Sequence, residues 1–183
     1  MSRAGKLLAP LAAVAALGYL AAMVVVGAMP VQRQLVRFEA KGVLSLPPES
    51  VRRVTVTRDG RTVTLLRTGE NAWSTESGTD VGQAAGAQLD TAVKVMHRSG
   101  PVRELAAEEL EGIDTKPFGL DDPDLAVAVF GAGAEPVVTA RFGAYNPEGI
   151  LQYMRLDGAA KVYLMSRFVS AEWASAHEEA EGR

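Results

Sequence analysis

Residues 7–31 form a run of 25 positions without a charged side chain, LLAPLAAVAALGYLAAMVVVGAMPV. As an α-helix this run would extend about 37 Å, which is enough to cross the roughly 30 Å hydrocarbon core of a bilayer. Pro10 lies near its beginning, where a helix tolerates proline best. The run therefore predicts a single transmembrane helix that acts as a signal anchor.

Two other interpretations of this run fit less well. The sequence Val26-Gly27-Ala28 offers residues of about the right size for signal-peptide cleavage, but the apolar core of a signal peptide has about 7–15 residues and this run is longer. A buried helix of a globular domain would carry a polar face, which this run lacks.

The positive charges on the two sides of the run nearly balance. The flanking cations, which we expect to contact lipid headgroups, are Arg3, Lys6, Arg33, Arg37 and Lys41. Because the positive-inside counts almost tie, the short tail of residues 1–6 decides the prediction. It favours a cytoplasmic tail, with the large C-terminal domain on the periplasmic side of the inner membrane.

Composition excludes several functional classes. The chain has no cysteine, which removes disulfides, thiolate nucleophiles, cysteine-ligated metals and a lipoprotein anchor. Its formal net charge is −3, and all 22 acidic residues lie after residue 33, so nucleic acid is not an expected partner.

Residues 32–50 are expected to form a juxtamembrane linker that ends near the stiff pair Pro47-Pro48. A folded domain is predicted over residues 51–176. The last residues, 177–183, are predicted to be a solvated acidic tail.

The domain begins with a clear hairpin pattern. Residues 51–67 alternate between apolar and polar side chains, and Asp59-Gly60 interrupts them as a tight-turn signal because glycine accepts the required positive φ. Residues 71–75 are expected to add a third strand, with Trp73 pointing inward.

A helix is expected over residues 84–98, where Leu89, Val93 and Met96 recur at helical spacing. Phe168 and Trp173 are expected to be core residues of the last helix. The remaining predicted elements are one helical turn at 106–113, strands at 125–130, 136–142, 150–156 and 159–165, and a helix at 167–176. Sequential strands joined by tight turns indicate an α+β fold: a small, mostly antiparallel sheet with one or two packed helices, after a single transmembrane helix.

Several segments, taken in order, resemble a known family. They are the alternating stretch with its tryptophan at 54–73, FGLDDP at 118–123, ARFGAYNPEGILQYMRLDG at 140–158 and VYLMS at 162–166. Together with the apolar run, they resemble a bacterial domain-of-unknown-function family of membrane-anchored proteins, some associated with gliding-type ABC transporter auxiliary components. The resemblance implies an anchored extracytoplasmic domain beside a membrane complex, and it carries over no catalytic residue.

Asp121, Asp122 and Asp124 gather three carboxylates in four positions. An EF-hand loop needs ligands at alternating positions and glycine at the sixth, and this segment has neither. Aspartate beside proline is typical of a turn, so we interpret the cluster as a turn before a strand. A partner contact or a metal site stays open as an alternative.

Nothing in the sequence indicates an enzyme. The chain has only two histidines, His97 and His177, and neither lies in a zinc or catalytic-triad pattern. The loop at 130–136 lacks the third glycine and the following helix of a pyrophosphate site. We therefore expect no catalytic residue, no cofactor and no metal, and we do not expect a small-molecule ligand.

Two exposed segments are candidates for partner recognition. The arginine-rich hairpin carries Arg52, Arg53, Arg58, Arg61 and Arg67, which form either a solvated face or a contact for an anionic partner. Tyr145 and Asn146 lie in a turn that suits either a hairpin loop or recognition. The candidate partner surface is thus Arg52, Arg53, Arg58, Tyr145 and Asn146.

These observations predict a non-catalytic accessory or scaffold subunit. It would bind and stabilise a larger transporter or energy-transducing membrane assembly through its transmembrane helix, whose small residues allow close packing, and through its extracytoplasmic domain. The alternative is an anchored ligand-binding or sensing module of an ABC-type transport system.

Overall fold

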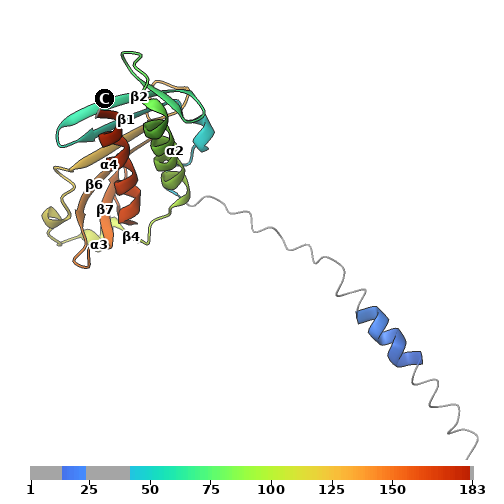
Figure 1. Cartoon of the computed structure of the whole chain (residues 1–183). Coiled ribbons are helices and arrows are strands. Elements are labelled where there is room, and N and C mark those ends of the chain that lie inside the picture. The colour runs from blue at the N-terminus through green and yellow to red at the C-terminus, as the bar shows by residue number, and fades with distance from the viewer. Residues whose placement is uncertain (1–13, 24–41, 182–183) are drawn as a thin grey trace, which may run out of the picture. The chain divides into compact units, whose positions relative to one another are not determined.

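The computed structural model describes residues 14–23 and 42–181 (Figure 1). Two compact units divide the chain, Met1–Glu39 and Ala40–Arg183. In the first unit, residues 14–23 are helical. Within the described ranges no helix combines the length and the apolar character needed to span a bilayer, and the rest of the predicted run 7–31 lies outside them.

The second unit is built on one antiparallel sheet of eight strands, in the order β3-β2-β1-β5-β6-β7-β8-β4. The strands are β1 (Arg53–Arg58), β2 (Arg61–Gly69), β3 (Ala72–Thr75), β4 (Arg103–Leu105), β5 (Leu125–Phe130), β6 (Val138–Tyr145), β7 (Leu151–Leu156) and β8 (Val162–Ser166). The prediction of an α+β domain with a mostly antiparallel sheet is confirmed.

The first half of the sheet follows the sequence pattern closely. Asp59 and Gly60 form the β1–β2 turn with φ of 49° and 74°, the left-handed conformations that a tight hairpin needs. β3 follows as the third strand, and then α2 (Gly82–Arg98) forms where Leu89, Val93 and Met96 make an apolar stripe.

The second half contains the hairpins β5–β6, β6–β7 and β7–β8, followed by α4 (Arg167–Glu181). The prediction that residues 177–183 form a solvated tail is wrong for its described part. α4 continues through Glu181, and His177 and Ala180 are buried. These residues continue the buried face that Trp173 and Ala176 begin, which the acidic residues between them conceal in the sequence.

α2 and α4 pack against each other on one face of the sheet, and β1 lies beside β5 at its centre (Figure 1). The core lies between this helical layer and the sheet. Trp73 and Trp173 are almost fully buried in it, as predicted. Phe168 is 67% exposed, so the prediction that it belongs to the core is wrong.

The connection from β4 at the sheet edge to β5 at the centre carries α3 (Ala107–Leu110) and the 3-10 helix η2 (Lys116–Phe118). The Phe118 ring stacks on Tyr153 with centroids 4.1 Å apart. Since Met154 faces the helices, its neighbour Tyr153 lies on the other face, and the connection therefore contacts the face opposite α2 and α4.

The predicted linker at 32–50 is partly domain. Gly42 and Leu44 donate backbone hydrogen bonds to the His97 and Met96 carbonyls at 3.1 and 3.4 Å, and Leu44 is fully buried. A Cβ on Gly42 would collide with the His97 carbonyl, so glycine is needed for this close approach. The folded domain therefore begins by residue 42, ahead of the predicted boundary at 51, and η1 (Pro48–Ser50) belongs to it.

Candidate functional site

The predicted headgroup contacts Arg3, Lys6, Arg33, Arg37 and Lys41 lie outside the described residues. The predicted partner surface on the hairpin does not form one face, because strand alternation sends neighbouring arginines to opposite sides. Arg53 lies on the face opposite the helices, with its guanidinium carbon 3.8 Å from the centroid of Phe130 and a 3.0 Å hydrogen bond to the Ala134 carbonyl. Arg52 is exposed and lines a cleft described below.

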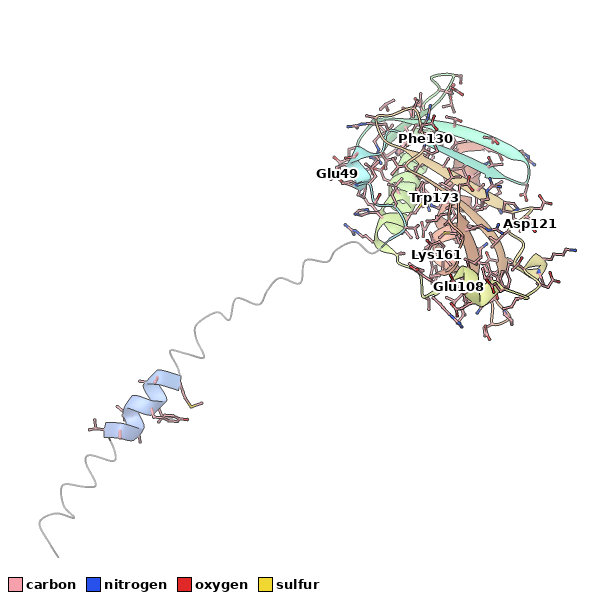
Figure 2. All side chains as sticks on the ribbon, turned by 180° about the vertical axis from the view of Figure 1, so that it is seen from behind. Glu49, Glu108, Asp121, Phe130, Lys161 and Trp173 are labelled. Carbon is pink, nitrogen blue, oxygen red and sulfur yellow. The ribbon has the colours of Figure 1, made fainter. Side chains whose placement is uncertain are left out.

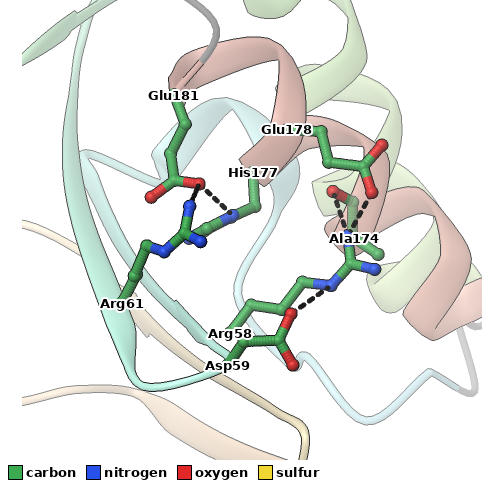
Figure 3. Close-up of polar contacts among 7 residues, drawn as sticks. All are labelled: Arg58, Asp59, Arg61, Ala174, His177, Glu178 and Glu181. Carbon is green, nitrogen blue, oxygen red and sulfur yellow. Dashed lines mark hydrogen bonds and ion pairs between the residues drawn. The ribbon is translucent and has the colours of Figure 1, made fainter.

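Arg58 and Arg61 connect the β1–β2 hairpin to the end of α4 (Figure 3). Arg58 Nη1 lies 2.5 Å from Glu178 Oε1, and Arg61 Nη1 lies 3.3 Å from Glu181 Oε2. His177 Nδ1 lies 3.6 Å from the same Glu181 oxygen. Part of the predicted solvated face thus serves contacts between the sheet and a helix.

Tyr145 and Asn146 behave differently from each other. Asn146 Oδ1 accepts hydrogen bonds from the backbone N–H groups of Ile150 and Leu151 at 3.1 and 2.9 Å. It therefore organises the β6–β7 turn, as the hairpin-loop interpretation predicts. Tyr145 is exposed and is the member of this pair that a partner could contact.

Arg67 forms a buried polar cluster that sequence reasoning missed. Its guanidinium Nη2 lies 2.7 Å from Asp90 Oδ1 on α2, and only 9% and 4% of the two side chains are exposed. Asp90 also accepts hydrogen bonds from Trp73 Nε1 at 2.9 Å and from the Asn71 N–H at 3.1 Å. Arg67 lies over the Trp73 ring at 4.5 Å.

Two signals in the sequence could have found this cluster. Arg67 continues the register of Val63 and Leu65, so it faces the helices with them. Asp90 directly follows Leu89 in the apolar stripe of the helix, where a carboxylate needs a partner.

A cleft of about 410 Å³ opens beside this cluster. Its charged lining residues are the cations Arg52, Arg67 and Lys94 and the acids Glu49, Glu70 and Asp90. Within residues 14–23 and 42–181, Arg67 Nε is buried without a hydrogen-bond partner. The mixed charges of the lining suit a small polar or zwitterionic molecule.

The histidines do not form a site together. His97 Nδ1 lies 2.9 Å from the Leu44 carbonyl at the end of α2, and His177 lies in the buried face of α4. Over the described part of the chain, no three or more His, Cys, Asp or Glu side chains gather closely enough to hold a metal. Asp121 of the predicted turn lies 3.6 Å from Arg155 as an exposed ion pair.

Two residues of the short edge strand β4, Arg103 and Glu104, form ion pairs. The Ala106 N–H and then Arg103 lower the pKa of the Glu109 carboxyl, which lies 3.0 and 2.9 Å from them. The hydrogen bond to Glu104 raises the pKa of Lys161. These exposed pairs organise the edge and form no reactive arrangement.

A second exposed feature lies where β8 meets α4. Val102, Ile150 and Phe168 are 65%, 61% and 67% exposed, and we call them the junction surface. The Arg167 N–H, next to Phe168, bonds to the Ile150 carbonyl at 3.3 Å. The Val102 N–H bonds to the Leu164 carbonyl of β8 at 2.8 Å, so all three residues lie near the C-terminal end of β8.

In comparisons with known proteins, no family model, no curated protein and no solved structure matches the chain. The resemblance to a membrane-anchored family therefore stays a prediction.

Proposed function

We propose that the protein is a non-catalytic, single-pass accessory subunit that holds an α+β domain at the extracytoplasmic face of a membrane and stabilises a larger membrane assembly there. The observation that carries the proposal is the uncharged run at 7–31. Its length fits a bilayer, and a soluble domain has no use for 25 successive positions without a charge.

The beginning of the domain supports a scaffold role. The backbone of Gly42 and Leu44 is hydrogen-bonded to the end of α2, and Leu44 is buried in the core. The covalent link from the run therefore ends on a packed part of the domain rather than on a long free loop. The ten residues 32–41 between the run and Gly42 then limit how far the domain can be from the anchor.

Two measurements test the proposal. Alkaline phosphatase fused after Arg183 should be active in bacterial cells, whereas activity of a cytoplasmic reporter alone at the same position would contradict the orientation. Purification in a gentle detergent followed by mass spectrometry should recover membrane subunits together with the chain. A chain that is recovered alone and without detergent would contradict the accessory-subunit proposal.

The cleft beside Arg67 favours a second candidate function, an anchored ligand-binding or sensing module. Its volume of about 410 Å³ and its mixed charges suit a small polar or zwitterionic solute. Native mass spectrometry of the purified chain should then detect a bound small molecule. Lys94→Ala, an exposed change at the cleft wall, should weaken that binding, and the exposed Lys116→Ala is the matched control.

A further inference from the structure

The junction surface lies at the end of the domain where the chain enters it. α2 ends at Arg98, and Gly42 and Leu44 bond to carbonyls of its last turn. Only Ser99, Gly100 and Pro101 separate α2 from Val102. α4 begins at this end, below the label of α2 in Figure 1, and the chain finishes at the opposite end, marked C.

The length of the connecting chain limits how far this end can be from the apolar run. Ten residues, 32–41, separate the run from Gly42. Even fully extended, ten residues reach at most about 35 Å. If the run spans a bilayer, Gly42 can therefore lie no farther than about 35 Å from the end of the run.

The side chains at this end have the chemistry of a membrane interface. Phe168 is an aromatic side chain that residues 14–23 and 42–181 leave 67% exposed. Ile150 and Val102 are exposed aliphatic side chains. Two cations of this end are also exposed: Arg167, next to Phe168 in the chain, and Arg98, the last residue of α2. Aromatic residues are favoured at headgroup level, and cations near an anionic surface each add attraction on the order of 1 kcal/mol.

The neighbouring carboxylates oppose lipid contact less than their number suggests. Glu104 is paired with Lys161 and Glu109 is paired with Arg103, so these two charges are partly offset within the domain. Glu148 accepts a hydrogen bond from the neutral amide of Asn146 and keeps its charge.

We propose that the junction surface rests on the lipid bilayer itself, with the Phe168 ring, Ile150 and Val102 in the interfacial layer and Arg98 and Arg167 beside lipid phosphates. The inference rests on the proposed function, because it requires the membrane anchor. It adds an orientation: the β8–α4 end faces the lipid, and the β1–β2 hairpin and the end of α4 face away from it.

Tryptophan fluorescence of the full chain tests the orientation. The two native tryptophans, Trp73 and Trp173, are at most 1% exposed and provide a constant background. Phe168→Trp places a third indole on the junction surface. Val137→Trp is the matched control, because Val137 is also exposed but precedes β6, whereas Ile150 follows the turn after β6.

Each variant is reconstituted in vesicles of phosphatidylcholine and phosphatidylglycerol, with and without lipids brominated near the headgroup. With brominated lipid, Phe168→Trp should lose up to about a third of its total emission, because one of its three indoles would lie in the interface. Val137→Trp should keep the emission of the unmodified chain. Equal thermal unfolding of the two variants shows that both are folded.

The outcomes separate the two proposals. A chain that resists carbonate extraction while Phe168→Trp is not quenched overturns the orientation and leaves the anchor standing. A chain that carbonate extracts from the vesicles overturns the anchor and, with it, the orientation. A Phe168→Trp emission that is blue-shifted, unquenched and dependent on the protein-to-lipid ratio means that a second copy covers the junction surface, which also overturns lipid contact.

Discussion

The two helices hold arginines of the sheet in contrasting ways. On the α2 side, Arg67 and Asp90 are buried and joined to Trp73 and the Asn71 backbone. On the α4 side, the carboxylate of Glu178 is two-thirds exposed where it meets Arg58, and the Arg61 side chain that meets Glu181 is also mostly exposed (Figure 3). An arginine–carboxylate pair is therefore a specific internal contact in one place and a screened surface contact in the other.

The contrast teaches that an arginine-rich strand pattern does not define one surface. Strand register decides which arginines face the helices. How completely a helix covers each of these arginines then decides whether water can solvate it. Figure 2 shows Glu49 of η1 and Phe130 of β5 in the upper part of the domain, and Lys161 and Glu108 in its lower part.

The largest effect should come from Asp90→Ala. It leaves the buried Arg67 guanidinium without its countercharge and removes the acceptor of Trp73 Nε1. Loss of one partner of a buried pair costs about 3–5 kcal/mol, so the free energy of unfolding should fall by that amount in urea titrations followed by tryptophan fluorescence.

The double variant Arg67→Met with Asp90→Leu is the control for this prediction. It removes both charges and keeps apolar volume, so it should lose less stability than Asp90→Ala, although Trp73 Nε1 and the Asn71 N–H still lose their acceptor. If Asp90→Ala alone lowered the free energy of unfolding by less than about 1 kcal/mol, water would have to reach the Arg67–Asp90 pair. The contacts on the α2 side and on the α4 side would then be alike.

Gly86→Ala should have the next largest effect. In an ordinary helix position this change stabilises by up to about 1 kcal/mol, but here a Cβ would collide with the Asn71 carbonyl of the β2–β3 turn. We expect a loss of about 1–3 kcal/mol in the free energy of unfolding, measured by urea titration. Stabilisation instead would show that α2 can move away from the β2–β3 turn. The packing on the α2 side would then be no more rigid than the exposed ion pairs on the α4 side.

Glu178→Ala tests the α4 side. Because this carboxylate is largely exposed, its contact with Arg58 should contribute less than about 1 kcal/mol, and the contribution should shrink further in high salt. Urea titrations at low and high salt measure it. A loss as large as that of Asp90→Ala would remove the distinction between the two helices.

The smallest effect concerns pH at the β4 edge. The pKa of Glu109 is lowered below the 4.5 usual for glutamate, first by the Ala106 N–H and then by Arg103. A lowered pKa in the folded state means that the contact stabilises above the unfolded pKa and is lost as pH falls through the folded one. An NMR titration of the Glu109 carboxyl should give a midpoint below 4.5, and Arg103→Ala should raise it. A midpoint that stays the same in Arg103→Ala would show that the ion pair is not formed in solution.

The sequence by itself determined the local elements of this protein. The Asp59-Gly60 turn, the alternating strands of the first hairpin, the helix over 84–98 and the strand over 125–130 follow from short-range periodicity and turn chemistry. Since most strands are joined by tight turns, the antiparallel α+β class followed as well.

Tertiary structure decided what lies far apart in the chain. β1 pairs with β5, and the three-residue β4 forms only because β8 offers it an edge. Arg67 and Asp90 meet across 23 positions, and Phe118 stacks on Tyr153 from a crossing segment. The local periodicity of the sequence does not predict such pairs, because their stability comes from burial that exists only after the elements have packed.

The same reason explains the two terminal errors. The acidic residues after Ala176 conceal a helical face that α2 and the sheet bury, and Phe168 has the character of a core residue but starts its helix beyond the edge of the core. The hydrophobicity of a side chain determined whether it prefers to be buried. The packing of α4 on the sheet determined which of these side chains are buried in the folded protein.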